Sequence, residues 1–159
     1  MHPQAAQYTT PSTPSIVVLD SNVVLGLFWF QDPALGPLQR ALEDRTLAWH
    51  ACTSMREELM RVMGRDGLRP PSLSSMPLGR DHAARQVLSA FDALACPTPS
   101  MPNLSNPRCN DADDQVFIDL ALGLKARWLF SRDAAVLKLR RRLHALSGCH
   151  VMRPEAWRP

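Results

Sequence analysis

The chain has 159 residues and a mass of 17.7 kDa, which fits one domain with a substantial hydrophobic core. Apolar residues make up 45% of the chain and charged residues 21%, a composition that excludes disordered, collagen-like and coiled-coil proteins. The longest apolar stretch, residues 23–30, is about half as long as a membrane-spanning helix needs to be, and Gly26 interrupts it. The net charge of +3 is a weak indication of an anionic partner.

The first residues lack the features of an export signal. Residues 1–14 have neither a basic start nor an apolar centre, so we expect a flexible leader followed by a single domain over residues 15–157. The four cysteines show no CxxC spacing, and without an export signal we expect reduced thiols in a cytoplasmic protein. Proline clusters at 70–77 and 97–107 are predicted to be loops within the domain.

The first half of the chain begins with a continuous β-branched run, which predicts a buried strand of a parallel sheet over residues 15–19. The next residues, Asp20 to Asn22, are helix-capping types and precede an apolar run of helical length. Asp20 is therefore expected at the carboxyl end of a strand. Three further elements are predicted here: a helix with leucines at 35, 38 and 42, a strand over 47–51, and a helix from Ser54 to Gly64.

The second half continues the alternation of helix and strand. The predicted elements are an amphipathic helix over 81–95, a helix capped by the acids at 111–114, a strand over 127–130, a turn and cap at 131–133, a helix over 134–146 and a strand over 150–152. This alternation predicts an α/β fold, a three-layer α/β/α sandwich with a mainly parallel central sheet of four to five strands.

Acidic residues recur where parallel strands end. Three of them fall at strand ends or adjoining helix starts and one lies a turn into the helix after the second strand: Asp20, Asp114, Asp133 and Glu58. Ligands of open α/β sheets bind outside the carboxyl ends of the strands. Carboxylates gathered there need a counter-cation, and oxygen ligands select Mg²⁺ or Mn²⁺. Such an ion activates water and clamps phosphodiester oxygens, so the pattern predicts metal-dependent phosphoryl transfer.

Each acid also has a purely structural explanation. Asp20 and Asp133 could cap helices, and the acids at 111–114 all favour the positive end of the next helix. Glu58 stands beside Glu57, and either residue could lie on a solvated helix face. We select Glu58 as the site residue of this pair.

Several blocks together resemble the PIN domain. LDSNVVLGLF, MREELMRVM and CNDADDQVFIDLALGLKARWLFSRDAAVL follow the order and spacing of the family's motifs over residues 15–157. The resemblance is closest to the branch of toxin components of bacterial toxin–antitoxin pairs, the VapC-like ribonucleases. The chain departs from the family pattern with Ser21 for the usual Thr, Asn110 for Arg, Gln115 for Asp and Arg132 for Gly.

This resemblance implies a ribonuclease that depends on Mg²⁺ or Mn²⁺. When the family's site residues are transferred to the matching positions of this sequence, the implied catalytic and metal-binding acids are Asp20, Glu58, Asp114 and Asp133. Asn22 and Ser131 would support these acids through hydrogen bonds. The implied partners are RNA, a cognate antitoxin protein and, as is common in the family, a second copy of the chain, with no membrane.

RNA would be repelled by the acids alone, so contact with it needs positive charge nearby. The basic residues that flank the predicted site are the predicted RNA contacts: Arg132, Lys138, Arg141 and Arg56. An arginine at 132 suits bidentate phosphate recognition, although such basic runs are also common on solvated helix faces. Tyr8 and Trp157 are the aromatic residues expected to be exposed, whereas the other tryptophans are expected in the core.

Two alternatives belong to other functional classes. A phosphotransferase similar to the haloacid dehalogenases would use Asp20 as a covalent nucleophile, but it needs an acid two residues later, where this chain has Asn22. The second is a catalytically weak or inactive PIN-like module that acts through RNA or antitoxin binding.

Overall fold

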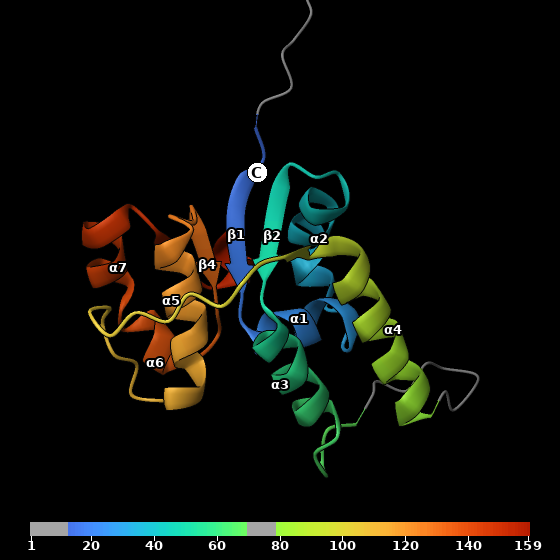
Figure 1. Ribbon diagram of the computed structural model, residues 1–159. Coiled ribbons are helices and arrows are strands. Elements are labelled where there is room, and N and C mark those ends of the chain that lie inside the picture. The colour runs from blue at the N-terminus through green and yellow to red at the C-terminus, as the bar shows by residue number, and fades with distance from the viewer. Residues whose placement is uncertain (1–12, 70–78) are drawn as a thin grey trace, which may run out of the picture.

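The computed structural model describes residues 13–69 and 79–159. The described residues form a five-stranded, all-parallel sheet in the order β3-β2-β1-β4-β5, with helices on both faces (Figure 1). The predicted three-layer α/β/α fold is confirmed. The predicted leader falls almost entirely outside the described residues, and so does the first proline cluster.

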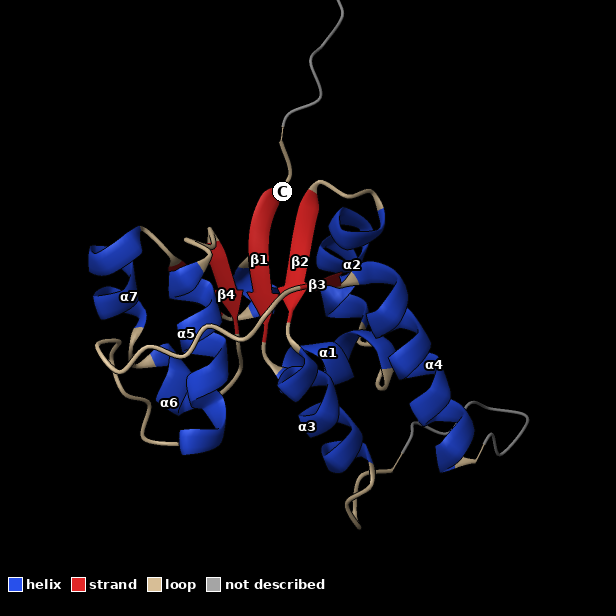
Figure 2. Cartoon of the chain, in the orientation of Figure 1, coloured by secondary structure: helices blue, strands red, loops and turns tan. Residues whose placement is uncertain are grey.

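The central strand β1 (Ser15–Leu19) lies between β2 (Leu47–Ala51) and β4 (Trp128–Phe130) (Figure 2). One edge of the sheet is formed by β5 (His150–Met152). In β1 the side chains of Val17 and Val18 point to opposite faces and both are fully buried. Helices on both faces therefore explain why the strand reads as a continuous apolar run.

The other edge strand, β3 (Cys96–Pro97), was not predicted. It pairs with the end of β2 and contains a proline, which cannot donate to a ladder and occurs mainly at sheet edges. Two residues are too few to show a period in the sequence.

The helices follow the predicted order within a few residues at most boundaries. They are α1 (Ser21–Phe28), α2 (Gly36–Glu43), α3 (Thr53–Met63), α4 (Arg80–Leu94), α5 (Gln115–Gly123), α6 (Ala134–Leu137) and α7 (Arg140–Ser147), with 3-10 turns η1 (Pro33–Leu35), η2 (Ala112–Asp114) and η3 (Pro154–Ala156). Within the described residues, no helix has the length and apolar character needed to cross a membrane.

The prediction of one continuous helix over 134–146 was wrong. The chain breaks between α6 and α7 at Leu139, whose backbone N–H bonds to Val136 and whose carbonyl accepts from Arg142, both three residues away. These tighter bonds replace the α-helical pattern locally, and apolar periodicity does not reveal such a break. The second helix then ends at Gly148, which adopts the left-handed conformation (φ 75°) typical of a helix C-terminus.

The prediction that Trp157 is exposed was also wrong. The C-terminal turn η3 folds back onto the sheet, so Trp157 is only 6% exposed and meets Trp128 and Phe130 edge-to-face, with ring centroids 6.1 and 6.2 Å apart. It closes the core beside β4 and offers no surface for base stacking. All four cysteines are unpaired, as expected.

Candidate acidic active site

The site begins where β1 and β4 end side by side. Leu19 lies opposite Phe130 in the parallel ladder, so the next residues, Asp20 and Ser131, are neighbours. The Asp20 N–H donates to the Phe130 carbonyl at 3.0 Å, and the Ser131 hydroxyl donates to Asp20 Oδ2 at 2.5 Å. Asp20 is 3% exposed and Ser131 is fully buried. The register of the sheet therefore creates this pair.

Asn22 provides a second support for Asp20. Its side-chain amide donates to Asp20 Oδ2 at 3.2 Å, while its Oδ1 accepts the Arg132 N–H at 3.1 Å. Asp20 occupies the N-cap position of α1, where the backbone N–H groups of Asn22 and Ser21 lower the pKa of its carboxyl, so a structural role at the start of the helix is compatible with a role in the site. Burial raises the pKa of Asp20, the Ser131 hydrogen bond opposes that shift, and the charge of Asp133 adds to it.

Asp133 has both a structural role and a place beside Asp20. Its N–H donates to the Ser131 hydroxyl at 3.0 Å, and its Oδ1 accepts the Ala135 N–H at 2.6 Å, which caps α6. One serine thus contacts two predicted site acids. The predicted capping role of Asp133 is confirmed, and its charge still acts on Asp20.

Asp114 lies at the end of η2, immediately before α5, and is 8% exposed. The capping bond of this turn is made by Asp111, which accepts the Asp113 N–H at 3.0 Å. Asp114 forms no side-chain hydrogen bond to the described residues. Burial raises the pKa of Asp114 to about 7, and the charges of Asp20, Asp133, Asp111 and Glu58 push it in the same direction.

Glu58 is the half-buried member of the glutamate pair on α3, and Glu57 is exposed. Burial raises the pKa of Glu58; the charges of Asp20 and Asp113 add to the shift, whereas Arg61 and Arg65 oppose it. Its carboxylate also makes no hydrogen bond to the described part of the chain. The charges of the other three acids, which come from three separate segments, all raise the pKa of Asp114, as expected of carboxylates at one edge of a sheet.

The donor set has the chemistry of a site for Mg²⁺ or Mn²⁺, because it consists of carboxylate oxygens that repel one another without a cation. Over residues 13–69 and 79–159, however, no three His, Cys, Asp or Glu side chains are grouped closely enough to hold a metal ion as they stand. Asp20 and Asp133 are fixed by hydrogen bonds. Glu58 and Asp114 are not, so these two are the carboxylates that can turn toward an ion.

The predicted RNA contacts occupy two kinds of position. Lys138 and Arg141 are exposed near the α6–α7 break. Arg56 instead forms an ion pair with Asp92 through two hydrogen bonds, each 2.8 Å long. This ion pair connects α3 to α4. Its guanidinium is therefore already occupied by a carboxylate.

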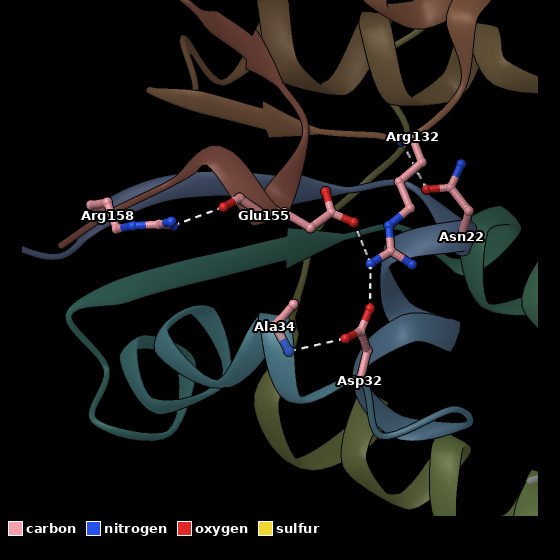
Figure 3. Close-up of polar contacts among 6 residues, drawn as sticks. All are labelled: Asn22, Asp32, Ala34, Arg132, Glu155 and Arg158. Atoms are coloured by element: carbon pink, nitrogen blue, oxygen red, sulfur yellow. Dashed lines mark hydrogen bonds and ion pairs between the residues drawn. The ribbon is translucent and has the colours of Figure 1, made fainter.

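Arg132 is likewise engaged, and Figure 3 shows its guanidinium pointing between Asp32 and Glu155. The distance to Asp32 Oδ2 is 2.8 Å, and the other contact is to Glu155 Oε1. A Cβ at Gly26 would lie 3.0 Å from Arg132 Nη1, so the glycine makes room for this side chain. Arg132 joins the loop after α1 to the C-terminal turn, instead of pointing freely at a substrate.

Sequence reasoning missed Asp32 and Glu155 as partners of Arg132, since no local pattern connects residues so far apart. It also missed Asp119, a buried acid that accepts hydrogen bonds at 2.9 Å from Asn106 and Gln115. Gln115 in turn accepts the Cys109 N–H at 2.9 Å. This network fixes the loop that leads into Asp114. The spacing of four between Gln115 and Asp119 on one helix was the available signal.

Comparison with known families assigns the chain to one of them. A family model described as PIN domain matches residues 16–135, three quarters of the chain. The chain belongs to the PIN domain family. No curated protein matches the chain significantly. PIN domains are generally nucleases that act on nucleic acid and usually use divalent metal ions. Glu58, Asp20 and Asp114 lie within the matched segment of this PIN domain, and so does Asp133.

Proposed function

We propose that this PIN domain is an endoribonuclease that depends on Mg²⁺ or Mn²⁺ and hydrolyses RNA phosphodiester bonds. Its proposed catalytic and metal-binding residues are Asp20, Glu58, Asp114 and Asp133. The observation that carries the proposal is the convergence on Asp114, a buried acid whose pKa is raised by burial and then by the charges of Asp20, Asp133 and Glu58. Burying acids without a cation costs stability, so a fold that keeps them together is suited to a cation.

The supporting residues have distinct proposed roles. The Ser131 hydroxyl favours the ionised form of Asp20 and fixes its orientation, and the Asn22 amide donates to the same oxygen. Glu58 and Asp114 supply carboxylates that are free of other hydrogen bonds to the described residues. A divalent ion bound by these groups would neutralise the phosphate and lower the pKa of the attacking water.

We further propose that the protein is the toxin of a bacterial toxin–antitoxin pair. The motif order of the VapC-like branch supports this role, and with it a cognate antitoxin, a homodimer and action on RNA in the cytoplasm. The whole of residues 15–157 would act as a single PIN domain. Growth arrest on expression that a neighbouring gene relieves is the expected result. If the protein cleaves RNA but its expression does not arrest growth, the toxin role is contradicted and the nuclease proposal is not.

The nuclease is tested with purified protein and single-stranded RNA. We expect cleavage with Mg²⁺ or Mn²⁺, none in excess EDTA, and a loss of about a thousandfold or more in Asp20→Asn, because the variant removes a charge from the proposed metal site. Asp44→Asn is the matched control, since Asp44 is exposed at the end of α2. Equal cleavage by Asp20→Asn, or cleavage in EDTA, would overturn the proposal.

One observation favours the alternative of a weak or inactive PIN-like module. As they stand, the described His, Cys, Asp and Glu side chains include no group of three arranged for a metal ion. Such a module would bind RNA in a salt-dependent manner and show no binding in a Mn²⁺ titration. Mn²⁺ binding that Asp20→Asn abolishes would argue for the enzyme.

A further inference from the structure

A cavity of about 330 Å³ lies between α7 and the edge strand β5. Its lining residues are Arg140, Arg141, His144, His150, Val151 and Met152. None of these six is acidic. The rings of His144 and His150 lie 4.6 Å apart between centroids, and both side chains are exposed. The cavity therefore combines two guanidinium groups with a pair of neighbouring imidazole rings.

We call this the α7–β5 cavity. A backbone hydrogen bond links one of its lining residues to the acidic site. Met152 lies opposite Phe130 in the parallel ladder, so it stands at the carboxyl end of β5. Its carbonyl accepts the Ser131 N–H at 3.1 Å, and the hydroxyl of the same serine donates to Asp20. His150 lies opposite Trp128 at the amino end of β5, so a chain of nucleotides that left the acids would meet the Met152 end of the cavity first and the histidine pair after it.

The two arginines of the cavity differ from Arg56 and Arg132, the two arginines of the predicted RNA contacts that lie outside it. Arg56 and Arg132 are paired with carboxylates, whereas Arg140 and Arg141 have no ion pair to any residue the structure describes. Unpaired guanidinium groups bind phosphate oxygens in a two-pronged manner. Imidazole rings are among the side chains on which unstacked RNA bases stack.

We infer that the α7–β5 cavity binds a single-stranded segment of the RNA substrate, with Arg140 and Arg141 on backbone phosphates and His144 and His150 against bases. This inference rests on the proposed function and extends it to the path of the substrate. RNA is favoured over an acidic peptide because the cavity offers both rings and cations and adjoins the acids proposed to cut RNA. Arg141 was a predicted contact, whereas the two histidines add the stacking surface that the tryptophans do not provide.

The test measures binding of a short fluorescein-labelled oligouridine by anisotropy, in EDTA and over a range of salt. Because EDTA prevents cleavage, the measurement is independent of nuclease activity. Arg140→Gln with Arg141→Gln should weaken binding and reduce the slope of log affinity against log salt by about 1.4, since each lost phosphate contact on single strands removes about 0.7. Arg142→Gln is the matched control, being an exposed neighbour on α7 that does not line the cavity.

The stacking part is tested with His144→Ala and His150→Ala together. The double variant should lose about tenfold in affinity for oligouridine, in the range for loss of base stacking, and should lose nothing against an abasic oligonucleotide of the same length. Both side chains are exposed, so thermal melting should match the wild type. Equal losses on both probes would contradict base stacking.

Other outcomes also decide the inference. Wild-type affinity in both double variants, or losses no larger than in Arg142→Gln, would overturn it. Displacement of the RNA by poly-glutamate of equal charge at equal concentration would overturn the RNA assignment and indicate an acidic peptide. A protein that binds RNA through this cavity but never cleaves it would support the inference while contradicting the proposed nuclease.

Discussion

Ser131 and Asp20 are 111 positions apart in the chain, yet a hydrogen bond of 2.5 Å joins them at the carboxyl edge of the sheet. The pairing of β1 with β4 is what brings them together. The same hydroxyl accepts the Asp133 N–H, so Ser131 links two acids of the proposed site. Its loss should therefore affect both the stability of the fold and the ionisation of Asp20.

Ser131→Ala should lower the free energy of unfolding by about 1–3 kcal/mol, because Asp20 loses a partner in a buried setting. Since the hydrogen bond lowers the pKa of Asp20, the variant should also move the acidic limb of the cleavage profile to higher pH. Denaturant unfolding and a pH–rate profile check the two effects. Ser147→Ala, which removes a hydroxyl bonded to the Leu143 carbonyl, should leave the pH profile unchanged. A shift of equal size in both variants would contradict the assigned role.

Stability without a metal should fall as the pH rises from the acidic range toward neutrality. The pKa of Asp114 is raised from 3.8 to about 7 in the folded state, so its favourable contribution is fully present below the unfolded value and is lost through the folded one. The full shift corresponds to about 4 kcal/mol, which solvent screening reduces to about 1–2 kcal/mol. Asp114→Asn should flatten the decline between about pH 4 and about pH 7.

The measurement is urea unfolding at several pH values, with EDTA present. Asp44→Asn is the control, since that aspartate is exposed, and it should retain the wild-type decline. Added Mg²⁺ should restore stability on the alkaline side, because an ion that binds only the folded state stabilises it. An unfolding free energy in Asp114→Asn that declines as steeply as in the wild type would refute the assigned cause.

Arg132 should act as a structural tie between distant segments. Arg132→Lys keeps the charge but loses the planar fork that contacts Asp32 and Glu155, so we expect a loss of about 1–3 kcal/mol in unfolding free energy. A double-mutant cycle with Asp32→Asn should be non-additive. RNA affinity in EDTA should change less than stability does. A large loss of RNA affinity with unchanged stability would return Arg132 to the substrate contacts.

Much of the fold could be predicted because the signals were local. The β-branched run of β1, the alternation of helices and strands and the acids at strand ends are all read from short windows. Support by Ser131 was implied only by the resemblance to the PIN domain, and the Ser131–Asp20 hydrogen bond agrees with that implication. The choice of Glu58 over Glu57 agrees with its greater burial.

What could not be predicted depends on contacts between distant residues. The Arg132 contacts with Asp32 and Glu155 leave no periodic pattern, and the burial of Trp157 depends on how the C-terminal turn packs against β4. The pairing of His144 with His150 arises because α7 returns along β5. Each of these features follows from tertiary packing that a single sequence does not encode locally.

A crystal structure with Mn²⁺ tests most directly whether the proposed carboxylates bind a divalent ion. We predict an anomalous peak bound by Asp20 and by at least one of the two unengaged acids, Glu58 and Asp114, and no such peak in Asp20→Asn. Anomalous density elsewhere on the protein, or none among these carboxylates at saturating Mn²⁺, would contradict the account.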